Sequence, residues 1–440
     1  MNFDMPTLRG ARRLNCMQCD ASPAERSNWD AWLPPRPNRT RRLLGWGAAL
    51  AVALILPFLF PGTLGISVLT QICIAITFAL AYNMLLGGTG LLSFGHALYF
   101  GIGAYTTAHF LNHFGESAPV VLVPLVGGIA ALVIGACVAL FTVRSGKVIF
   151  AMISLAVGQL AFSAATILTG FSGGDEGIRI DPTHAAGWGI DFGSPLNVYL
   201  LVAAWAWCAA LAMYALTFTP LGRLMNATRD NPERMDFIGF NPVMIRGLAL
   251  TLSAGFAGIA GSLYALGFQV VTLDTLSLTQ STAGMLHAYV GGYTSYFGPV
   301  IGALLITLAT AHLSTLSDAW PLYLGVFFVA VTLSWRYGLT GGVTDLLRLA
   351  PKTYRQEGAA YVARRTSPVL LGALLACAGF VLLVELIQSL SANMGAPVRL
   401  AFLPGDLAAD PRSAVAWVVS IALLAGGLAL LCVKPRAARP

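Results

Sequence analysis

The segment from Ile66 to Leu86 reads ISVLTQICIAITFALAYNMLL and contains no Asp, Glu, Lys or Arg. A helix needs about 20 apolar residues to cross the hydrocarbon core of a bilayer. A helix that is apolar on every side must be surrounded by protein or by lipid. We therefore interpret this segment as a transmembrane helix, and it decides the fold class.

Further segments of the same apolar character lie before and after it. They run over Leu43–Phe60, Leu91–Leu111, Val120–Thr142, Val148–Gly170, Val198–Leu216, Gly247–Val271, Ser281–Val290, Pro299–Leu313, Pro321–Trp335, Val369–Leu390 and Ala414–Val433. The sequence thus predicts an all-α polytopic membrane protein, with about ten helices in a core and two more near the C-terminus.

The composition agrees with a membrane protein. Hydrophobic residues make up 57% of the chain and charged residues only 10%, whereas a soluble domain is usually about a quarter charged. The net charge is +7, but the basic residues lie in short segments between apolar runs rather than in a patch with aromatic residues. We expect a lipid bilayer as the surroundings and no nucleic acid as a partner.

The basic residues also predict the orientation, because cytoplasmic loops carry an excess of Lys and Arg. They gather before the first predicted span, between the fourth and fifth, between the sixth and seventh, and after the tenth. All of these groups fall on one side only if Ser281 to Leu313 crosses twice, turning around Gly291 to Gly298. We predict a multi-pass chain with both termini cytoplasmic.

Four regions follow from this topology. Residues 1–42 form a cytoplasmic N-terminal tail, and 43–345 a transmembrane domain with a cytoplasmic loop at 217–246. Residues 346–368 form a cytoplasmic linker, and 369–440 a C-terminal extension with two transmembrane helices.

Motifs for catalysis or for nucleotide binding are missing from the sequence. Gly146-Lys147 is followed by Val148, without the spaced glycine of a phosphate loop. The first ten spans carry essentially no charged residue well inside, although proton-coupled and ion-coupled carriers often need one there. Glu385, in the C-terminal pair, is the exception. We predict no catalytic residues, no metal site and no enzyme activity, and expect another subunit to supply energy.

Two segments resemble each other, namely Gly87 to His96 and Gly291 to Pro299. Each has a glycine pair, then a hydroxyl residue and Phe-Gly, and a glycine-containing apolar segment follows. Glycine-interrupted helices at corresponding places of a repeat are typical of many transporter folds. Close helix packing is the alternative explanation for any single glycine.

The loop from Thr219 to Asn241 has the charges of a helix at the membrane surface. Gly239 is suited to end that helix with a positive φ. Leu224, Phe237 and Ile238 would offer an apolar face to a partner. An amphipathic surface helix without a partner explains the same pattern.

The stretch from Pro220 to Pro242 closely resembles the coupling segment of permease (transmembrane) subunits in the branched-chain amino-acid ABC importer family. Further segments resemble the same family in the same order: Tyr82 to Tyr105, Phe171 to Ile178, Ala257 to Tyr264, Val290 to Gly302 and Arg336 to Gly341. The resemblance covers about Leu43 to Val343.

This resemblance implies an ABC importer permease core of about ten helices. It implies a second permease subunit, two cytoplasmic ATPase subunits and a periplasmic substrate-binding protein as partners. This chain would bind no cofactor, and ATP and Mg would bind to the ATPase subunits. The expected activity is inward transport of branched-chain amino acids or a related small polar solute across the bacterial inner membrane. An ABC permease for urea, short amides, sugars or nucleosides, a secondary carrier and a membrane enzyme are the alternatives.

The resemblance also assigns residues. Those implied to face the ATPase are Gly222, Arg223, Arg229, Asp230, Asn231, Glu233 and Gly239. Those implied as candidates for the translocation pathway are Asn83, Gly87, Gly88, Ser93, His96, Gly291 and Gly292. The chain departs from the family in its long N-terminal tail, in Met235-Asp236-Phe237 within a usually alanine-rich helix, and in the extension from about Ala350.

Overall fold

The computed structural model describes residues 39–59, 62–114, 119–180, 194–335, 338–342, 372, 375–388, 398–399, 408–409 and 414–432. Residues 1–38 of the predicted tail and the whole predicted linker lie outside them. The chain divides into two units, Met1–Leu56 and Pro57–Pro440. Helix α3 (Arg39–Leu59) starts in the first unit and begins four residues before the predicted span.

The second unit is helical, as predicted. Its helices are α4 (Thr63–Thr89), α5 (His96–Phe114), η1 (Val120–Leu122), α6 (Val123–Thr142), α7 (Lys147–Ile167), α8 (Thr169–Ser172), η2 (Gly174–Glu176), α9 (Pro195–Phe218), α10 (Pro220–Asp230), α11 (Pro232–Phe237), α12 (Pro242–Phe268), η4 (Leu273–Leu276), α13 (Leu278–Gly291), α14 (Gly298–Leu316), α15 (Trp320–Ser334) and α18 (Ala414–Cys432). A further apolar helix covers Leu375–Gln388. Two short antiparallel ladders pair β1 (Ile178–Arg179) with β2 (Val270–Val271), and β3 (Val398–Arg399) with β4 (Ala408–Ala409).

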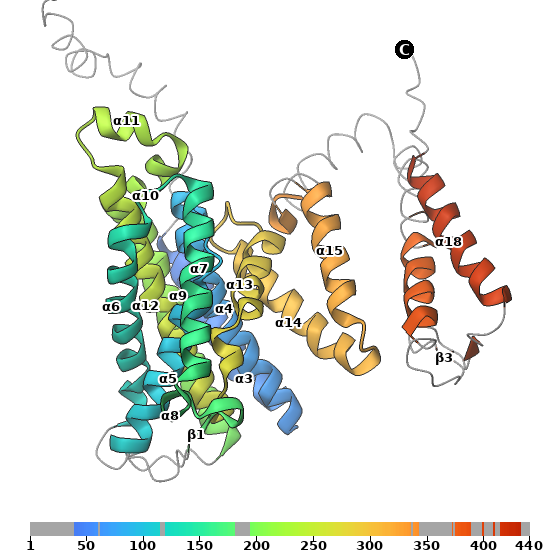
Figure 1. Cartoon of the computed structure of the whole chain (residues 1–440), viewed down its shortest axis with the longest axis horizontal. Coiled ribbons are helices and arrows are strands. Elements are labelled where there is room, and N and C mark those ends of the chain that lie inside the picture. Colours follow the sequence, from blue (N-terminus) through green and yellow to red (C-terminus); the bar gives the residue numbers. More distant parts are fainter. Residues whose placement is uncertain are drawn as a thin grey trace, which may run out of the picture. The chain divides into compact units, whose positions relative to one another are not determined.

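Helix α12 is central, because it packs against α4, α5, α6 and α9. These helices run alongside one another in Figure 1, with α10 and α11 at one end of the bundle and β1 at the other. We call these the α10–α11 end and the β1–β2 end.

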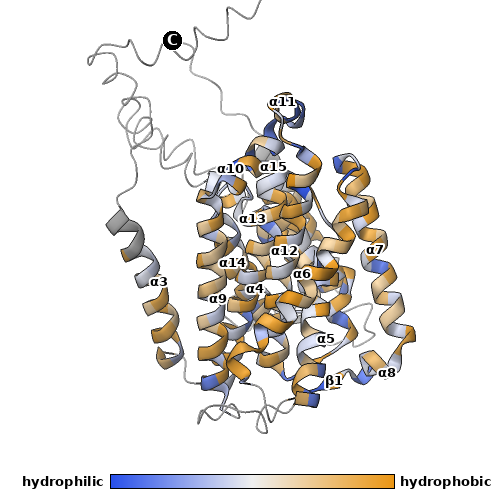
Figure 2. Cartoon of the chain, turned by 90° about the vertical axis from the view of Figure 1, so that its left-hand side faces the viewer, coloured by the Kyte–Doolittle hydropathy of each residue, from blue (hydrophilic) through white to orange (hydrophobic). Residues whose placement is uncertain are grey.

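Six of the described helical segments are long and apolar enough to cross a bilayer: Thr63–Thr89, Val120–Thr142, Lys147–Ile167, Pro195–Phe218, Pro242–Phe268 and Gly298–Leu316. In Figure 2 the long helices are mainly orange along their sides, whereas blue residues gather at the α10–α11 end and near β1. This distribution is the one expected of an all-α polytopic membrane protein.

Small residues let the central helices approach closely. A Cβ atom added to Gly103 of α5 would overlap the backbone of Gly258 in α12, and one added to Gly261 would overlap the carbonyl of Phe100. Such contacts bring backbones together where lipid offers no hydrophobic driving force for helix association. At these positions the glycines serve packing.

The predicted third span starts too early. Leu91 to Gly95 is not helical, and α5 begins at His96. Gly90 ends α4 with a φ of +70°, and the backbone N–H of Phe94 then donates to Ser154 Oγ at 3.1 Å. Irregular backbone is tolerated inside a membrane where protein satisfies its polar groups.

The predicted seventh span is displaced in the opposite sense. Helix α12 begins at Pro242, before the expected Gly247, and ends at Phe268. Val270 and Val271 instead form β2, which pairs with β1. Gln269 separates the helix and the strand with a φ of +58°.

Both repeat copies lie where one helix stops and the next begins. Helix α4 ends directly after the first glycine pair, and α13 ends at Gly291, the first glycine of the second pair. Helix α5 begins directly after the first Phe-Gly pair, and α14 begins at the glycine of the second pair. The structure thus has two helices across Ser281 to Leu313, and the number of membrane crossings stays a prediction.

Candidate functional site

A cavity of about 330 Å³ opens near the α10–α11 end of the bundle. Its walls are α4, α9, α10 and the turn between α13 and α14. The lining residues are Leu80, Asn83, Met84, Gly87, Gly88, Met213, Tyr214, Leu216, Thr217, Phe218, Leu221, Gly222, Met225, Asn226, Arg229, Tyr293, Thr294, Ser295 and Tyr296. We call it the α4–α10 cavity.

The α4 wall offers hydrogen-bond acceptors. Asn83 is buried, and its Oδ1 has no hydrogen-bond partner among the described residues. A Cβ at Gly87 would lie 2.5 Å from the carbonyl oxygen of Tyr293 and 2.6 Å from Asn83 Oδ1. Only a glycine leaves room for these two oxygens. Because an unpaired buried acceptor is costly, this wall is suited to receive a donor group.

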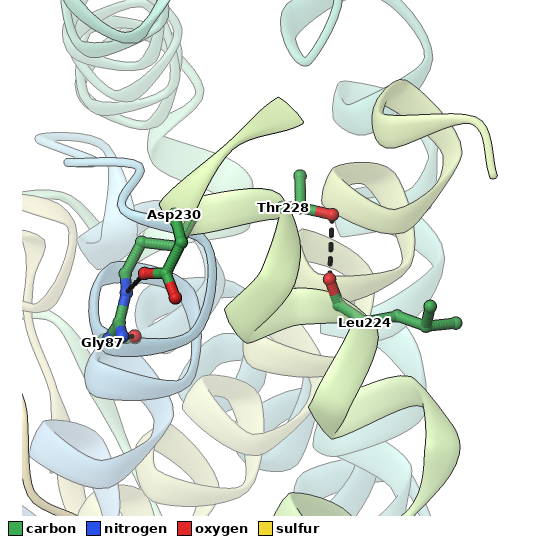
Figure 3. A network of polar contacts seen from close by, with 5 residues as sticks. Gly87, Leu224, Thr228 and Asp230 are labelled. Atoms are coloured by element: carbon green, nitrogen blue, oxygen red, sulfur yellow. Dashed lines mark hydrogen bonds and ion pairs between the residues drawn. The ribbon is translucent and has the colours of Figure 1, made fainter. Parts of the chain in front are cut away.

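The α10 wall is held by local bonds. Thr219 caps the helix by accepting from the N–H of Gly222 at 3.3 Å. Arg229, at the other end of α10, donates from Nη1 to the carbonyl oxygen of Gly87 at 2.6 Å and pairs with Asp230 at 3.2 Å. Figure 3 shows this end of the helix, with Gly87 and Asp230, the two partners of Arg229, labelled.

The single surface helix expected in the coupling segment is divided in the structure. Helix α10 ends at Asp230 and α11 begins at Pro232, because proline lacks an N–H and disfavours helical backbone at the residue before it. Asn231, implied to face the ATPase, caps α11 by accepting from the N–H of Arg234 at 2.9 Å. Its side chain therefore has a structural role.

The predicted stop at Gly239 is confirmed. Its φ is +92°, and the N–H of Phe240 donates to the carbonyl of Met235 at 3.0 Å across the end of α11. This bond is the kind that ends helices at a left-handed residue. The chain then turns into α12, whose first turn is capped by Asn241.

The other coupling residues divide into an outward and an inward group. Arg223, Asp230 and Glu233 are exposed, while Gly222 is buried and Arg229 is turned toward α4. The apolar residues behave similarly, since Phe237 is 91% exposed and Leu224 is half-buried. Helix α11 therefore presents a large aromatic side chain that nothing in the described chain covers.

Ser93 and His96 lie away from the α4–α10 cavity. His96 is completely buried, and its ring makes edge-to-face contacts with the rings of Tyr82 and Tyr99. The carbonyl of Ser93 accepts from the hydroxyl of Tyr82 at 2.9 Å, and its own Oγ has no partner among the described residues. These two residues hold helices together and do not line the cavity.

Gly291 and Gly292 also serve packing. The carbonyl of Gly291 accepts from Thr340 Oγ1 at 2.8 Å, and a Cβ on Gly338 would lie 2.6 Å from the Cα of Gly292. Gly338 and Thr340, which belong to the last segment of the family resemblance, thus lie against the second repeat copy. The sequence gives no sign of this contact.

Sequence reasoning also misses several lining residues. Tyr293 and Tyr296 lie within the second repeat copy, whose motif is defined by its glycines and not by its tyrosines. The hydroxyl of Tyr296 donates to the carbonyl of Ala210 in α9. Tyr214 and Met225 have no signal at all, because an aromatic residue in the apolar helix α9 and a Met in the amphipathic helix α10 are both usual. Among the described residues no cluster of His, Cys, Asp or Glu is arranged to hold a metal ion.

Comparisons with known proteins give a consistent result. The family described as branched-chain amino acid transport system / permease component matches residues 64–335. The high-affinity branched-chain amino acid transport system permease protein LivM of Escherichia coli is 27% identical over 312 residues, covering 66% of this chain and 72% of LivM. LivM of Salmonella typhimurium matches to the same extent.

The permease protein LivH of the same system in Escherichia coli is 25% identical over 257 residues. That alignment covers 54% of this chain and 82% of LivH. No solved structure matches the chain.

Proposed function

Because this chain belongs to the family of branched-chain amino acid transport permeases, we propose that it works as the transmembrane subunit of an ATP-driven ABC importer. Its cargo is a branched-chain amino acid or a related small polar solute, moved inward across a bacterial inner membrane. Members of this family are transport permeases and not enzymes.

The proposed assembly contains a second permease subunit, two cytoplasmic ATPase subunits and a periplasmic binding protein. Support comes from the relatives, because two differently named permease proteins of Escherichia coli both match this chain. ATP and Mg would bind to the ATPase subunits. The absence of a phosphate-loop motif in this sequence supports that division of labour.

One observation carries the proposal, namely that the cavity and an uncovered surface helix share one hairpin. Helix α10 lines the cavity, and α11, which follows directly, exposes Phe237 to the outside. A partner bound to α11 would act on the cavity wall through the short connection between α10 and α11, which precedes Pro232.

The orientation belongs to the same proposal. The α10–α11 end would be cytoplasmic, since it carries Arg223 and Arg234, and the β1–β2 end would be periplasmic, since Asp175 and Glu176 lie next to β1. This assignment follows the bias of basic residues toward cytoplasmic loops.

Alternating access would proceed by movement of the cavity walls. The lining combines apolar side chains such as Leu80 and Met213 with the acceptor oxygens near Asn83 and with the Arg229 cation. A small solute with an ammonium or amide group, a carboxylate and an apolar side chain suits such a lining. Repositioning of α10 would open or close the cavity at the α10–α11 end.

Reconstitution tests the proposal. We expect liposomes that hold the complete transporter to accumulate labelled leucine, isoleucine or valine only with ATP on the ATPase side and the binding protein on the other. Urea, glucose and a nucleoside serve as competitors from the alternative solute classes. Uptake driven by an ion gradient, without the ATPase subunits, would contradict an ABC mechanism and favour a secondary carrier.

A further inference from the structure

The C-terminal end of α4 is held by a residue of the coupling segment. The carbonyl of Gly87 belongs to the last turn of α4, where carbonyl groups lack partners within the helix. The Arg229 guanidinium reaches it from α10 at 2.6 Å. A cation is favourable at this end of a helix because of the helix dipole, and a hydrogen bond from a charged donor is among the stronger ones.

The surroundings of Arg229 restrict its side chain. It is 31% exposed, so most of its surface contacts protein. A Cβ at Gly90, the residue that caps α4, would lie 3.0 Å from Arg229 Cγ and 3.4 Å from Lys147 Nζ. Two cations from α10 and α7 thus approach the end of α4, and the bond to the Gly87 carbonyl comes from Arg229.

A second contact lies one turn away on the same face of α10. Met225 is buried, and a Cβ at Gly88 would lie 3.6 Å from its Cβ. Met225 and Arg229 are four residues apart and therefore lie on one side of the helix. That side rests on the glycine pair of α4. Thr228, which bonds the carbonyl of Leu224 within α10, takes no part in this contact (Figure 3).

We propose that Arg229 is a positioning residue that ties α10 to α4, so that displacement of the α10–α11 hairpin moves the α4 wall of the cavity together with Asn83. We call the Arg229 to Gly87 bond the α10–α4 tie. Its role in transport rests on the proposed function, because the displacing force would come from an ATPase. The tie itself is a property of this chain. Met225 alone gives an apolar contact that permits sliding, whereas a guanidinium bonded to a carbonyl fixes direction and register.

The first experiment measures uptake and ATP hydrolysis in the same proteoliposomes. We expect Arg229→Gln to lower the amount of solute moved per ATP by about tenfold, while ATP hydrolysis stays within about twofold. The ATPase subunits would still hydrolyse ATP, but the α4 wall of the cavity would no longer move with α10. Arg229→Lys keeps a cation with a donor and should lose only about threefold. Arg144→Gln removes an exposed charge at the same end and is the matched control.

If Arg229→Gln moves as much solute per ATP as the unsubstituted chain, to within about twofold, then Arg229 does not transmit movement from α10 to α4. A parallel loss of uptake and hydrolysis would overturn it too, since the defect would then lie in ATPase docking.

The second experiment tests the tie without transport. Gly88→Cys combined with Met225→Cys places two thiols at a Cβ separation that suits a disulfide. The bond is identified by peptide mass mapping, because the chain has seven native cysteines. We expect the disulfide to form about fivefold more slowly when Arg229→Gln is added, because α10 then leaves α4 more often.

Equal rates of disulfide formation would refute the tie even in a working importer. Conversely, if the unsubstituted complex shows no ATP-driven uptake, the proposed function fails while the disulfide rates still decide on the tie.

Discussion

His96 Nε2 lies 2.8 Å from Ser253 Oγ in the interior of the bundle, although 157 positions separate the two residues. The Ser253 hydroxyl itself donates to the carbonyl of Ala81 at 2.6 Å. Since its single hydrogen is used there, the proton of the imidazole is on Nε2, which donates to the serine. One chain of hydrogen bonds thus joins α5, α12 and α4.

This chain of bonds predicts a stability effect. Replacing His96 by Ala should lower the free energy of unfolding by about 2–4 kcal/mol, because it empties a packed aromatic site and removes a buried bond. Thermal unfolding in detergent measures it. Ser67→Ala is the control, since that exposed hydroxyl bonds only its own helix, and an equal loss in both variants would contradict the prediction.

Adjacent glycines of α4 should respond differently to alanine. Gly87→Ala brings its Cβ within 2.6 Å of Asn83 Oδ1, whereas Gly88→Ala makes an ordinary contact with Met225 at 3.6 Å. We expect a loss of about 1–3 kcal/mol for Gly87→Ala and under about 0.5 kcal/mol for Gly88→Ala. Thermal unfolding of both purified variants, with uptake measured in parallel, tests this. Similar stability would show that the α4 wall is less closely packed.

Gly239 should tolerate asparagine but not valine. Its φ of +92° strains a β-branched residue, whereas asparagine visits positive φ more readily, and no neighbouring atom lies within 4 Å of the place that a Cβ would take. We expect Gly239→Val to abolish ATP-driven uptake at unchanged membrane levels, and Gly239→Asn to retain most of it. Uptake assays with immunoblots of the membrane fraction measure both, and normal uptake by the valine variant would refute the coupling role of this turn.

Phe237 should anchor the ATPase. Buried aromatic anchors commonly contribute about 2 kcal/mol or more to an interface, so Phe237→Ser should weaken ATPase binding by about thirtyfold. Affinity measured in nanodiscs tests this. Phe114→Ser removes an exposed aromatic of α5 in the part of the chain near the β1–β2 end and serves as the control. If the unsubstituted chain, Phe237→Ser and Phe114→Ser all bind the ATPase with equal affinity, the ATPase binds elsewhere.

The hydroxyl of Tyr323 donates to Glu385 Oε1 at 2.8 Å and links α15 to the C-terminal extension. A double-mutant cycle of Tyr323→Phe and Glu385→Gln should give a coupling free energy of about 0.6–1.7 kcal/mol, the range of hydrogen bonds between membrane helices. The control cycle combines Thr332→Val with Glu385→Gln, because the Thr332 hydroxyl donates only to a carbonyl of its own helix, α15. Additive losses in both cycles would mean that the bond contributes nothing.

Part of the fold follows from the sequence because it is local. Apolar length places the helices, and the positive φ of Gly239 follows from its position after a surface helix. The predicted helix boundaries are wrong where a helix-breaking residue competes with apolarity or charge pattern. Leu91 and Leu92 are apolar but lie beyond the helix stop at Gly90, and Pro232 divides a segment that charge alone predicts as one helix.

The site is less predictable, because its members meet only through packing. Asn83, Gly87 and Gly88 do line a cavity, and Gly222 and Arg229 line it with them. Ser93, His96, Gly291 and Gly292 come from the same motifs, yet they face other helices. A motif gives residue types and spacing, but not the side of a helix that a neighbour covers.

Sequence alone determines that this chain belongs in a bilayer, because segments of some 20 apolar residues without charges are long enough to cross the hydrocarbon core as helices. It also determines where glycine and proline break those helices. Only the tertiary structure decides that Arg229 points inward to Gly87 while Phe237 points outward, since a side chain's partner depends on backbones brought together from distant parts of the chain.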